Sequence, residues 1–345
     1  MTSLISGVVQ HYEWGDRHTL PELLGLPTDD KPWAELWFGT HLAGPSKVRI
    51  QGESRPLADV AGDLSFLVKV IAAAEPLSLQ THPTLEQARA GFERENNAGV
   101  PVLTANRIYR DASAKPELLC ALTNFDALCG FRPLDESIRL CTENGWDELG
   151  EHLVADGLDK CVEWALRTKG LELPHNLPDW VLRMATAYPE SGGILVALLM
   201  NYVQLVPDES LFLDAGNVHA YLHGTAVEVM SSSDNVIRAA FTKKHVDINE
   251  FLKVANLSPS PPSFCRPTTI DLSCVQYEVP TSAFGMQRID VRESYSVTAN
   301  HDAEILLCTS GDAGIVSRGQ AAVLSKGEEV RLTGPATVFR TWGTK

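Results

Sequence analysis

The sequence predicts a mainly β protein that carries a helical insertion, and two observations support this fold class. Short β-type runs separated by Gly, Pro and Asp fill the chain to about Cys129 and return after Pro207. Between them, from about Leu134 to Val206, apolar residues recur at the three-to-four spacing of amphipathic helices. Helices bracketed by two β regions indicate an α insertion in, or between, β-sandwich domains.

The β regions contain short runs of strand-forming residues, at 48–50, 65–71, 210–213, 226–229, 303–308 and 338–340. One helix stands out in the first region. Thr84 followed three residues later by Gln87 is the capping-box pattern, which places a helix start at Thr84. This helix should end near Glu95, before Gly99. A further helix is expected over about Gly193 to Val206.

These patterns divide the chain into three expected domains. Residues 1–130 together with 207–255 form a catalytic β domain, 131–206 a helical insertion domain, and 256–345 a C-terminal β domain. The Pro-rich segment from Ser258 to Pro262 is expected to link the last domain to the rest.

Composition excludes several classes of protein. The 345 residues include 29 Lys and Arg against 44 Asp and Glu, which gives a net charge of −15. Such a surface repels nucleic acid and anionic membranes, so a bound anion requires a local cluster of cations. Seven cysteines with no Cys-x-x-Cys pair indicate reduced, buried thiols. Because neither a secretory signal nor a membrane span is visible, we expect a cytoplasmic protein.

Polar residues alternate with apolar ones in the segment 76–83. If the segment is a strand, Ser78, Gln80 and His82 point to one face, and Pro83 favours the extended conformation. This face either lines a site or is an ordinary exposed face of a sheet.

Two further segments carry candidate metal ligands or acid–base groups. Lys115 and Glu117 open a largely apolar strand, where they form either a surface ion pair or part of a site. His219 and His223 follow a Gly turn, without the Glu that a His-Glu-x-x-His protease requires. On a strand the two are too far apart to bind one ion, so His219 is the better ligand and His223 a polar neighbour.

The most cation-rich stretch near these candidates starts at Glu228. It contains Ser233, Asp234 and Asn235, then Arg238, and continues to Lys243 and Lys244. It is either a solvated loop or a place that holds an anionic substrate.

Together these segments strongly resemble type I mannose-6-phosphate isomerases, the zinc-dependent phosphomannose isomerases of the cupin class. The matching motifs occur in one order within residues 7–255, at 10–15, 34–41, 76–83, 91–96, 115–118, 130–132, 214–221 and 228–238. The resemblance implies a cupin-type β-barrel or jelly-roll catalytic domain, a helical domain and a second, C-terminal β-barrel-like domain.

The resemblance also implies the site residues. One Zn²⁺ ion would be bound by two imidazoles, a carboxylate and an amide, from Gln80, His82, Glu117 and His219. Arg238 would be the active-site arginine, and Lys115 or Glu228 would transfer the proton. The substrate would contact the residues expected to line the pocket, which are Trp14, Ser78, Tyr221 and Lys244.

The implied reaction interconverts mannose 6-phosphate and fructose 6-phosphate through an enediol, which feeds mannose, GDP-mannose and carbohydrate metabolism. We expect a monomer whose partner is a small phosphorylated sugar, with no nucleic-acid or membrane partner. Two alternatives are a non-catalytic cupin that binds sugars or regulates, and an iron-dependent cupin oxygenase using His82, His219 and Glu117. The first should have lost ligands or Arg238, and the second leaves Gln80 unexplained.

The chain departs from the family's usual residues at three places beside the site. Ser113-Ala114 replaces Asn-His, Ala239-Ala240 follows Arg238 where a Gly is common, and Lys243 stands where Pro is frequent. These changes leave every expected ligand in place and affect the shape of the loops.

Overall fold

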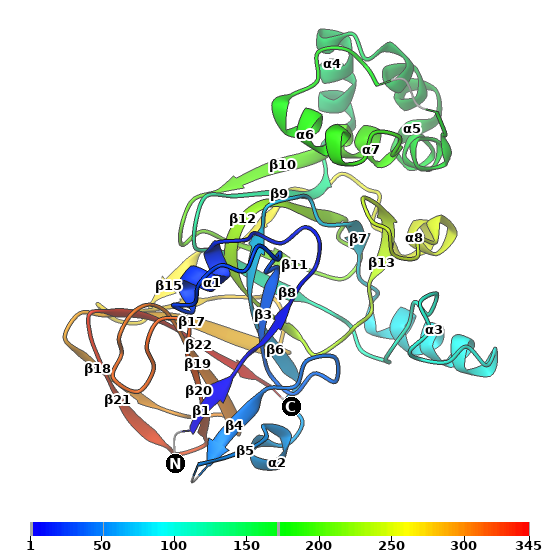
Figure 1. Cartoon of the computed structure of the whole chain (residues 1–345). Helices are drawn as coiled ribbons and strands as arrows, with labels where there is room; N and C mark the ends of the chain where they lie inside the picture. Colours follow the sequence, from blue (N-terminus) through cyan, green and yellow to red (C-terminus); the bar gives the residue numbers. More distant parts are fainter. Residues whose placement is uncertain (1–2, 51, 171–172, 345) are drawn as a thin grey trace.

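Two large β-sheets pack together and a group of helices covers one end. A computed structural model describes residues 3–50, 52–170 and 173–344. Figure 1 shows the helices α4 to α7 gathered at the top, above β9 and β10, while both chain termini lie at the opposite end, near the C-terminal strands. The mainly β fold with a helical insertion is therefore confirmed.

The first sheet has 11 strands and contains most of the segments predicted to form the site. Its strands are β2 (Val8–Gln10), β3 (Glu35–Phe38), β6 (Phe66–Ala73), β7 (Leu79–Thr81), β8 (Glu117–Ala121), β9 (Phe125–Phe131), β10 (Met200–Leu205), β11 (Ser210–Leu213), β12 (His219–Ser231), β13 (Ile237–Ala240) and β14 (Ser263–Phe264). All pairings within it are antiparallel.

Strand β12 connects the two parts of this sheet. Its second half pairs with β6 and β8, and its first half pairs with β7 and β9. Between the two halves, Gly224 has φ +118°, and a Cβ there would lie 2.5 Å from the carbonyl oxygen of Asn124. Only Gly fits such a bend, which lets one strand bring residues from four others together.

The second sheet has nine strands, in the order β15-β16-β17-β22-β19-β20-β1-β4-β5. Its strands are β1 (Ser3–Ser6), β4 (Lys47–Ile50), β5 (Glu53–Pro56), β15 (Pro267–Thr269), β16 (Cys274–Tyr277), β17 (Phe284–Val291), β19 (Ala303–Gly311), β20 (Ala321–Ser325) and β22 (Ala336–Gly343). A separate pair, β18 (Ser294–Thr298) and β21 (Glu329–Thr333), packs beside it through a second apolar core.

One apolar core joins the two large sheets, and Phe66, Phe212 and Phe339 are fully buried in it. The N-terminal strands β1, β4 and β5, which fall within the range assigned to the catalytic domain, belong to the sheet of the C-terminal strands. The expected linker is also held in place, because the Ser260 N–H donates to the carbonyl of Phe131 at 2.9 Å. The division into domains stays a prediction.

Eight helices accompany the sheets in the described part of the chain. They are α1 (Thr19–Leu23), α2 (Ala58–Ala61), α3 (Leu85–Asn97), α4 (Leu134–Asn144), α5 (Asp147–Arg167), α6 (Asp179–Ala187), α7 (Gly193–Leu199) and α8 (Ile248–Val254). The predicted capping box of α3 is present, with the Thr84 side chain accepting from the Gln87 N–H and the Gln87 side chain accepting in return.

The prediction of one helix over Gly193 to Val206 is wrong in its second half. Helix α7 ends at Leu199, and the chain continues as β10, which pairs with β9. A continuous apolar run does not distinguish a buried helix from a buried strand by its period. In β10 the buried Val203 and Leu205 alternate with the exposed Gln204, a period-two pattern too short to be decisive.

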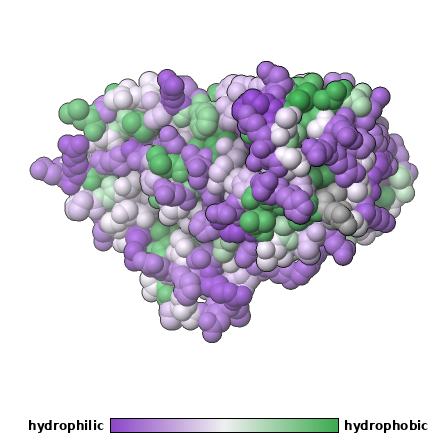
Figure 2. All heavy atoms as spheres, turned by 90° about the horizontal axis from the view of Figure 1, so that it is seen from above, coloured by the Kyte–Doolittle hydropathy of each residue, from purple (hydrophilic) through white to green (hydrophobic). Residues whose placement is uncertain are grey.

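The seven cysteines are free and buried, as predicted. None of the helices in the described residues has the length and apolarity needed to cross a bilayer. Figure 2 shows a face of the molecule on which hydrophilic residues predominate and apolar residues gather in small groups.

Candidate metal centre and substrate pocket

Three segments far apart in the sequence meet around the start of β12. His219 is the first residue of β12 and lies opposite Gln80 of β7 in the strand register. His82 follows directly after β7, and Glu117 is the first residue of β8. In the strand register Gln80 lies opposite His219, whereas Glu117 lies opposite Met230 near the other end of β12. The Glu117 carboxylate nevertheless lies 3.6 Å from His219, so the sheet curves back on itself and brings the predicted ligands together.

His82, Glu117 and His219 form a compact buried cluster. Their side chains are at most 3% exposed, and one ligand atom of each lies within 4.8 Å of the other two. The Nε2 of His82 lies 3.4 Å from Oε1 of Glu117, and the Nε2 of His219 lies 3.6 Å from Oε2. Two imidazoles and a carboxylate at these separations are a donor set for a transition-metal ion such as Zn²⁺.

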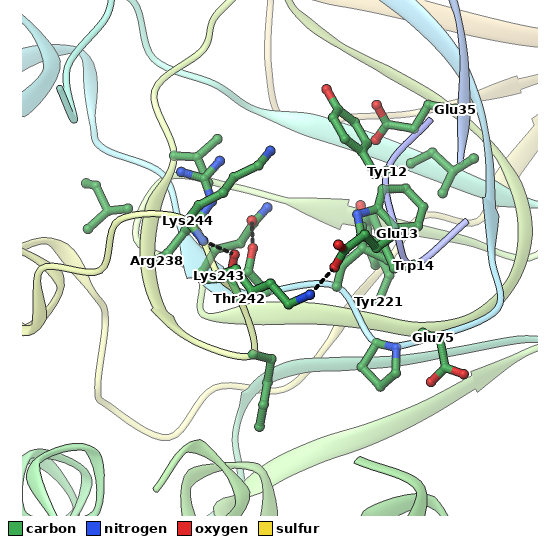
Figure 3. A pocket seen from close by; sticks show the side chains of 18 of the residues that line it. Tyr12, Glu13, Trp14, Glu35, Glu75, Tyr221, Arg238, Thr242, Lys243 and Lys244 are labelled. Carbon is green, nitrogen blue, oxygen red and sulfur yellow. Dashed lines mark hydrogen bonds and ion pairs between the residues drawn. The ribbon is translucent and has the colours of Figure 1, made fainter. Parts of the chain in front are cut away.

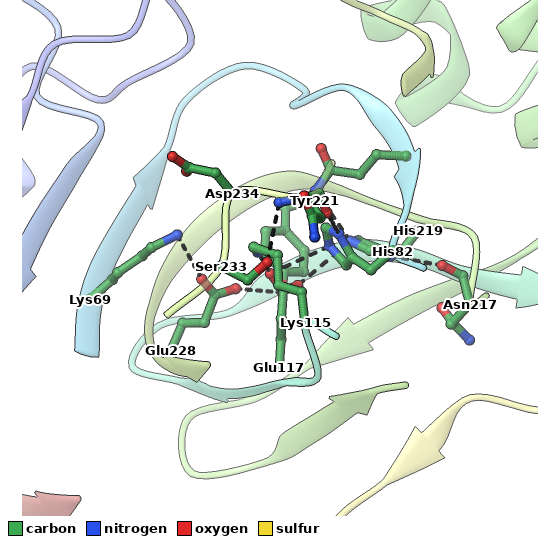
Figure 4. Close-up of polar contacts among 12 residues, drawn as sticks. Lys69, His82, Lys115, Glu117, Asn217, His219, Tyr221, Glu228, Ser233 and Asp234 are labelled. Carbon is green, nitrogen blue, oxygen red and sulfur yellow. Dashed lines mark hydrogen bonds and ion pairs between the residues drawn. The ribbon is translucent and has the colours of Figure 1, made fainter. Parts of the chain in front are cut away.

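The outer nitrogens of both imidazoles are already occupied. His82 Nδ1 donates to the carbonyl of Asn235 at 2.8 Å. His219 Nδ1 donates to the carbonyl of Asn217 at 3.1 Å (Figure 4). Since a carbonyl only accepts, the proton of each ring resides on Nδ1 and the lone pair of Nε2 faces Glu117. His82 Nε2 is buried without a hydrogen-bond partner, as expected of an atom that binds a metal.

The protonation states suit metal binding. Burial lowers the pKa of His219 to about 4 and lowers that of His82 as well, so both rings are neutral at pH 7. Burial works to raise the pKa of Glu117, but Lys115 and the two imidazoles outweigh it and hold that pKa well below its ordinary value. Neutral imidazoles and an ionised carboxylate are the forms that bind metal.

Gln80 lies beside the cluster, on the same strand face as Ser78. Its Nε2 is 3.3 Å from Nε2 of His219, and its Oε1 accepts a hydrogen bond from the Ser78 hydroxyl at 2.7 Å. A half-turn of the amide exchanges the two atoms and directs the oxygen toward the cluster.

A second group of buried charges lies on the central strands, next to the cluster. Lys69 Nζ is 3.2 Å from Glu228 Oε2 and 3.9 Å from Glu35 Oε1, and the Tyr221 hydroxyl donates to Glu228 Oε1 at 2.8 Å (Figure 4). Burial and the nearby charge of Glu117 raise the pKa of Glu228. A raised pKa makes a carboxylate a stronger base and so suits it to accepting a proton.

Three cations from two distant segments, Arg110 and the pair Arg238 and Lys244, line the same pocket. Lys244 Nζ lies 4.5 Å from the centre of the Tyr12 ring, and Arg238 lies close by (Figure 3). Burial lowers the pKa of Lys244 and of Arg238, and repulsion lowers both further, with Arg110 acting on each. Within the described residues, none of these three side chains has an ion-pair partner.

The pocket that these residues line has a volume of about 1170 Å³. Most of the predicted site residues line it, namely Trp14, Ser78, Gln80, Lys115, Glu117, Tyr221, Glu228, Arg238 and Lys244. His82 and His219 lie buried beside Glu117. His223, predicted as a polar neighbour, lines the pocket as an exposed side chain. The structure thus brings every predicted site residue to one place.

Sequence reasoning missed several charged residues that line the pocket, among them Glu35, Lys69 and Arg110. Lys69 carried a usable signal, because it is the one charged residue of β6, a strand whose eight residues are all buried. A lysine in such a strand requires buried carboxylate partners. Arg110 has no comparable local signal.

The fold and this site are those of a cupin-type enzyme with a buried donor set for a metal ion beside its pocket. A family model, "Phosphomannose isomerase type I, catalytic domain", matches residues 2–134. The mannose-6-phosphate isomerase of Escherichia coli K12 is 32% identical, over 98% of this chain and 97% of its own length. The human mannose-6-phosphate isomerase is 29% identical over 89% of this chain and 87% of its own.

Solved structures agree with these relatives. The mannose 6-phosphate isomerase of Salmonella typhimurium, bound to fructose 6-phosphate and zinc, matches with a TM-score of 0.89 at 29% identity, over the full length of both chains. A zinc-bound form of a mannose 6-phosphate isomerase matches equally well. The chain belongs to the type I mannose-6-phosphate isomerase family, and the resemblance seen in the sequence is confirmed.

Proposed function

We propose that the chain binds one Zn²⁺ ion through Gln80, His82, Glu117 and His219 and interconverts mannose 6-phosphate and fructose 6-phosphate. The observation that carries the proposal is the buried His82–Glu117–His219 cluster, whose Nε2 lone pairs face inward beside a pocket lined by unpaired cations. Zinc and substrate in the Salmonella typhimurium relative support it. When bound, Zn²⁺ polarises sugar oxygens and so favours loss of the neighbouring proton.

The cations at the pocket supply the affinity for the phosphate group. Among the described residues Lys244 and Arg110 form no ion pair, and they repel each other, so a phosphate placed between them gains attraction and relieves that repulsion. This cluster explains how a chain of net charge −15 attracts an anionic sugar.

Arg238 acts nearer to the reacting carbons. In the strand register it lies opposite Gln80, and side chains of directly paired residues share one face of the sheet. Its guanidinium is therefore beside the proposed metal ligands, where negative charge develops on the enediol oxygens. Its charge persists at any working pH, which suits a group that stabilises such oxygens.

Of the two groups expected to move the proton between carbon 2 and carbon 1, we favour Glu228. Its carboxyl group lines the pocket, has a raised pKa and is oriented by Tyr221 and Lys69. Lys115 forms a close ion pair with Glu117, so its ammonium is held against a proposed metal ligand. Lys115 is accordingly assigned to orienting Glu117 and the substrate oxygens.

A coupled assay tests the function directly. Mannose 6-phosphate should be converted to fructose 6-phosphate. In D₂O the product should carry deuterium at carbon 1, because the base that removes the carbon 2 proton exchanges it with solvent before returning one to carbon 1. Unphosphorylated mannose should react with a far lower kcat/KM, since it does not engage Lys244 and Arg110. Conversion of neither sugar, with zinc bound, would contradict the proposal. A monomeric, cytoplasmic enzyme stays a prediction from the sequence.

A further inference from the structure

We infer that Asn235 is a positioning residue that ties the proposed zinc ligand His82 to the segment carrying Arg110 and Lys115. The inference rests on the zinc site of the proposed function and assigns a role to a residue outside the ligand set. Asn235 is fully buried and precedes Arg238 by three residues.

The main chain of Asn235 fixes one imidazole. Its carbonyl accepts the Nδ1 proton of His82 at 2.8 Å, which directs Nε2 of that ring toward Glu117. A carbonyl in this role also holds the ring against rotation, so any displacement of residue 235 displaces a proposed metal ligand.

The side chain of Asn235 holds a different segment. Its Oδ1 accepts from the N–H of Arg110 at 2.8 Å and of Asp111 at 3.3 Å. Its Nδ2 donates to the carbonyls of Asp111 and Ser113, both at 2.9 Å. One amide therefore satisfies four main-chain groups of residues 110–113, the segment that leads directly into Lys115 and Glu117.

Asp111 binds residues 233–235 in return. Its carboxylate accepts from the Ser233 hydroxyl at 2.9 Å, from the Asp234 N–H at 2.8 Å and from Nδ2 of Asn235 at 3.1 Å. Residues 110–113 and 233–235 thus hold each other through a mutual set of bonds, which we name the Asn235 clamp. Because the clamp is buried, an unsatisfied member costs more than a lost surface bond.

The chemistry of the clamp requires Asn at this position. The same side chain must accept from two N–H groups and donate to two carbonyls, which neither Asp nor an apolar residue can do. The clamp also uses only main-chain groups of Ser113, so the replacement of the family's usual Asn-His by Ser113-Ala114 removes none of these bonds.

Zinc affinity in Asn235→Asp tests the inference. This change keeps the oxygen that accepts from Arg110 and Asp111. It replaces the NH₂ donor by a second oxygen, which then faces two carbonyls and the Asp111 carboxylate and repels them. We expect the Kd for zinc, measured by competition with a chelator on folded protein, to rise about 10- to 100-fold. Excess zinc should restore most of the lost isomerase activity.

Asn201→Asp is the matched control. The Asn201 amide also donates to two carbonyls, those of Cys129 and Ser260, at 2.9 Å each. We expect it to lower the Tm while the zinc Kd stays within about twofold of the parent. If Asn235→Asp fails to fold, Ser233→Ala is the second variant. It removes the hydroxyl that donates to the Asp111 carboxylate and accepts from the Asn235 N–H, and it should weaken zinc binding by a smaller factor.

The outcomes separate the two proposals. A zinc Kd like that of the parent in folded Asn235→Asp would overturn the inference. If that variant does not fold, a parent-like zinc Kd in Ser233→Ala would do so. An equal loss of zinc affinity in the control Asn201→Asp would overturn it as well. A parent chain that binds zinc but leaves mannose 6-phosphate unchanged contradicts the proposed function and leaves the clamp intact. A parent that binds no zinc overturns both.

Discussion

Both large sheets contain a buried cluster of charges, and the two clusters differ in how completely their atoms are bonded. In the C-terminal sheet, Glu304 is fully buried and accepts from Nε of Arg340 at 2.5 Å, from the N–H groups of Asn300 and His301, and from the His301 ring at 2.9 Å. Its Oε1 accepts from four donors and its Oε2 from Arg340, and because the side chain is fully buried no ligand reaches it. Such a cluster fixes the fold and takes no part in chemistry.

The cluster at β12 is bonded incompletely. His82 Nε2 has no hydrogen-bond partner, and within the described residues Arg238 and Lys244 form no ion pair. Burial is the largest cause that lowers the pKa of both cations, and repulsion by Arg110 lowers it further. Burial of charge is common to both sheets, so it does not by itself mark a site. A single unsatisfied atom does not mark one either, since Arg288 Nε in the C-terminal sheet also lacks a partner. The site is marked by the combination of an unsatisfied imidazole nitrogen with cations that form no ion pair around one pocket.

The largest expected effect follows from removing a proposed metal ligand. His219→Ala should lose zinc and lower isomerase activity by at least about 1000-fold, since the remaining donors no longer enclose the ion. Metal analysis of the purified variant, beside the coupled assay, measures both quantities. Full zinc occupancy in this variant would remove His219 from the ligand set.

Breaking the bonded cluster should affect stability instead. Arg340→Leu leaves the buried Glu304 carboxylate without its guanidinium, which should lower the free energy of unfolding by about 3–5 kcal/mol. Chemical denaturation measures the loss, and zinc content and kcat of the folded variant should match the parent. In the double variant Glu304→Gln with Arg340→Leu, part of the stability should return because no buried charge remains.

Removing Arg238 from the incompletely bonded cluster should lower activity and leave stability unchanged. Arg238→Ala should lower kcat about 100-fold, or about 2.7 kcal/mol in activation free energy, because charge on the enediol oxygens loses its partner. Zinc should remain bound and the Tm should not fall, since a repelled cation has been removed. Activity near that of the parent would exclude Arg238 from the mechanism.

The smallest effect is expected at the rim of the pocket. Lys243 Nζ lies 2.7 Å from Glu13 Oε2 across the opening (Figure 3), but both side chains are about four-fifths exposed. Since exposed pairs contribute little and salt screens them, Lys243→Ala should change kcat/KM less than about threefold at physiological salt. A tenfold loss that disappears at high salt would show instead that this pair closes the pocket.

The proposed ligands Gln80, His82, Glu117 and His219 could be named because each lies in a segment that matches a motif of the family. Spacing alone left each segment with an ordinary structural alternative. The capping box at Thr84 could be predicted from spacing, since its two partners are three residues apart. The end of α7 could not be predicted, because the buried apolar run from Ile194 continues into β10 without a change of composition. The strand partner, β9, decides that boundary, and pairing over 70 residues leaves no local trace.

The rest of the site depends on distant contacts. Glu35 and Lys69 meet Glu228 only because β3, β6 and β12 are neighbours in the sheet. The Asn235 clamp joins segments more than 120 residues apart through main-chain groups, which every sequence possesses. Such contacts are properties of the fold and have no signature in residue type.

The most direct test of the account is to follow isomerase activity as zinc is removed and returned. Protein stripped by a chelator should convert no mannose 6-phosphate, and activity should then rise in proportion to added zinc and level off at one ion per chain. Full activity in the stripped protein, or no recovery once one zinc per chain is bound, would contradict the account.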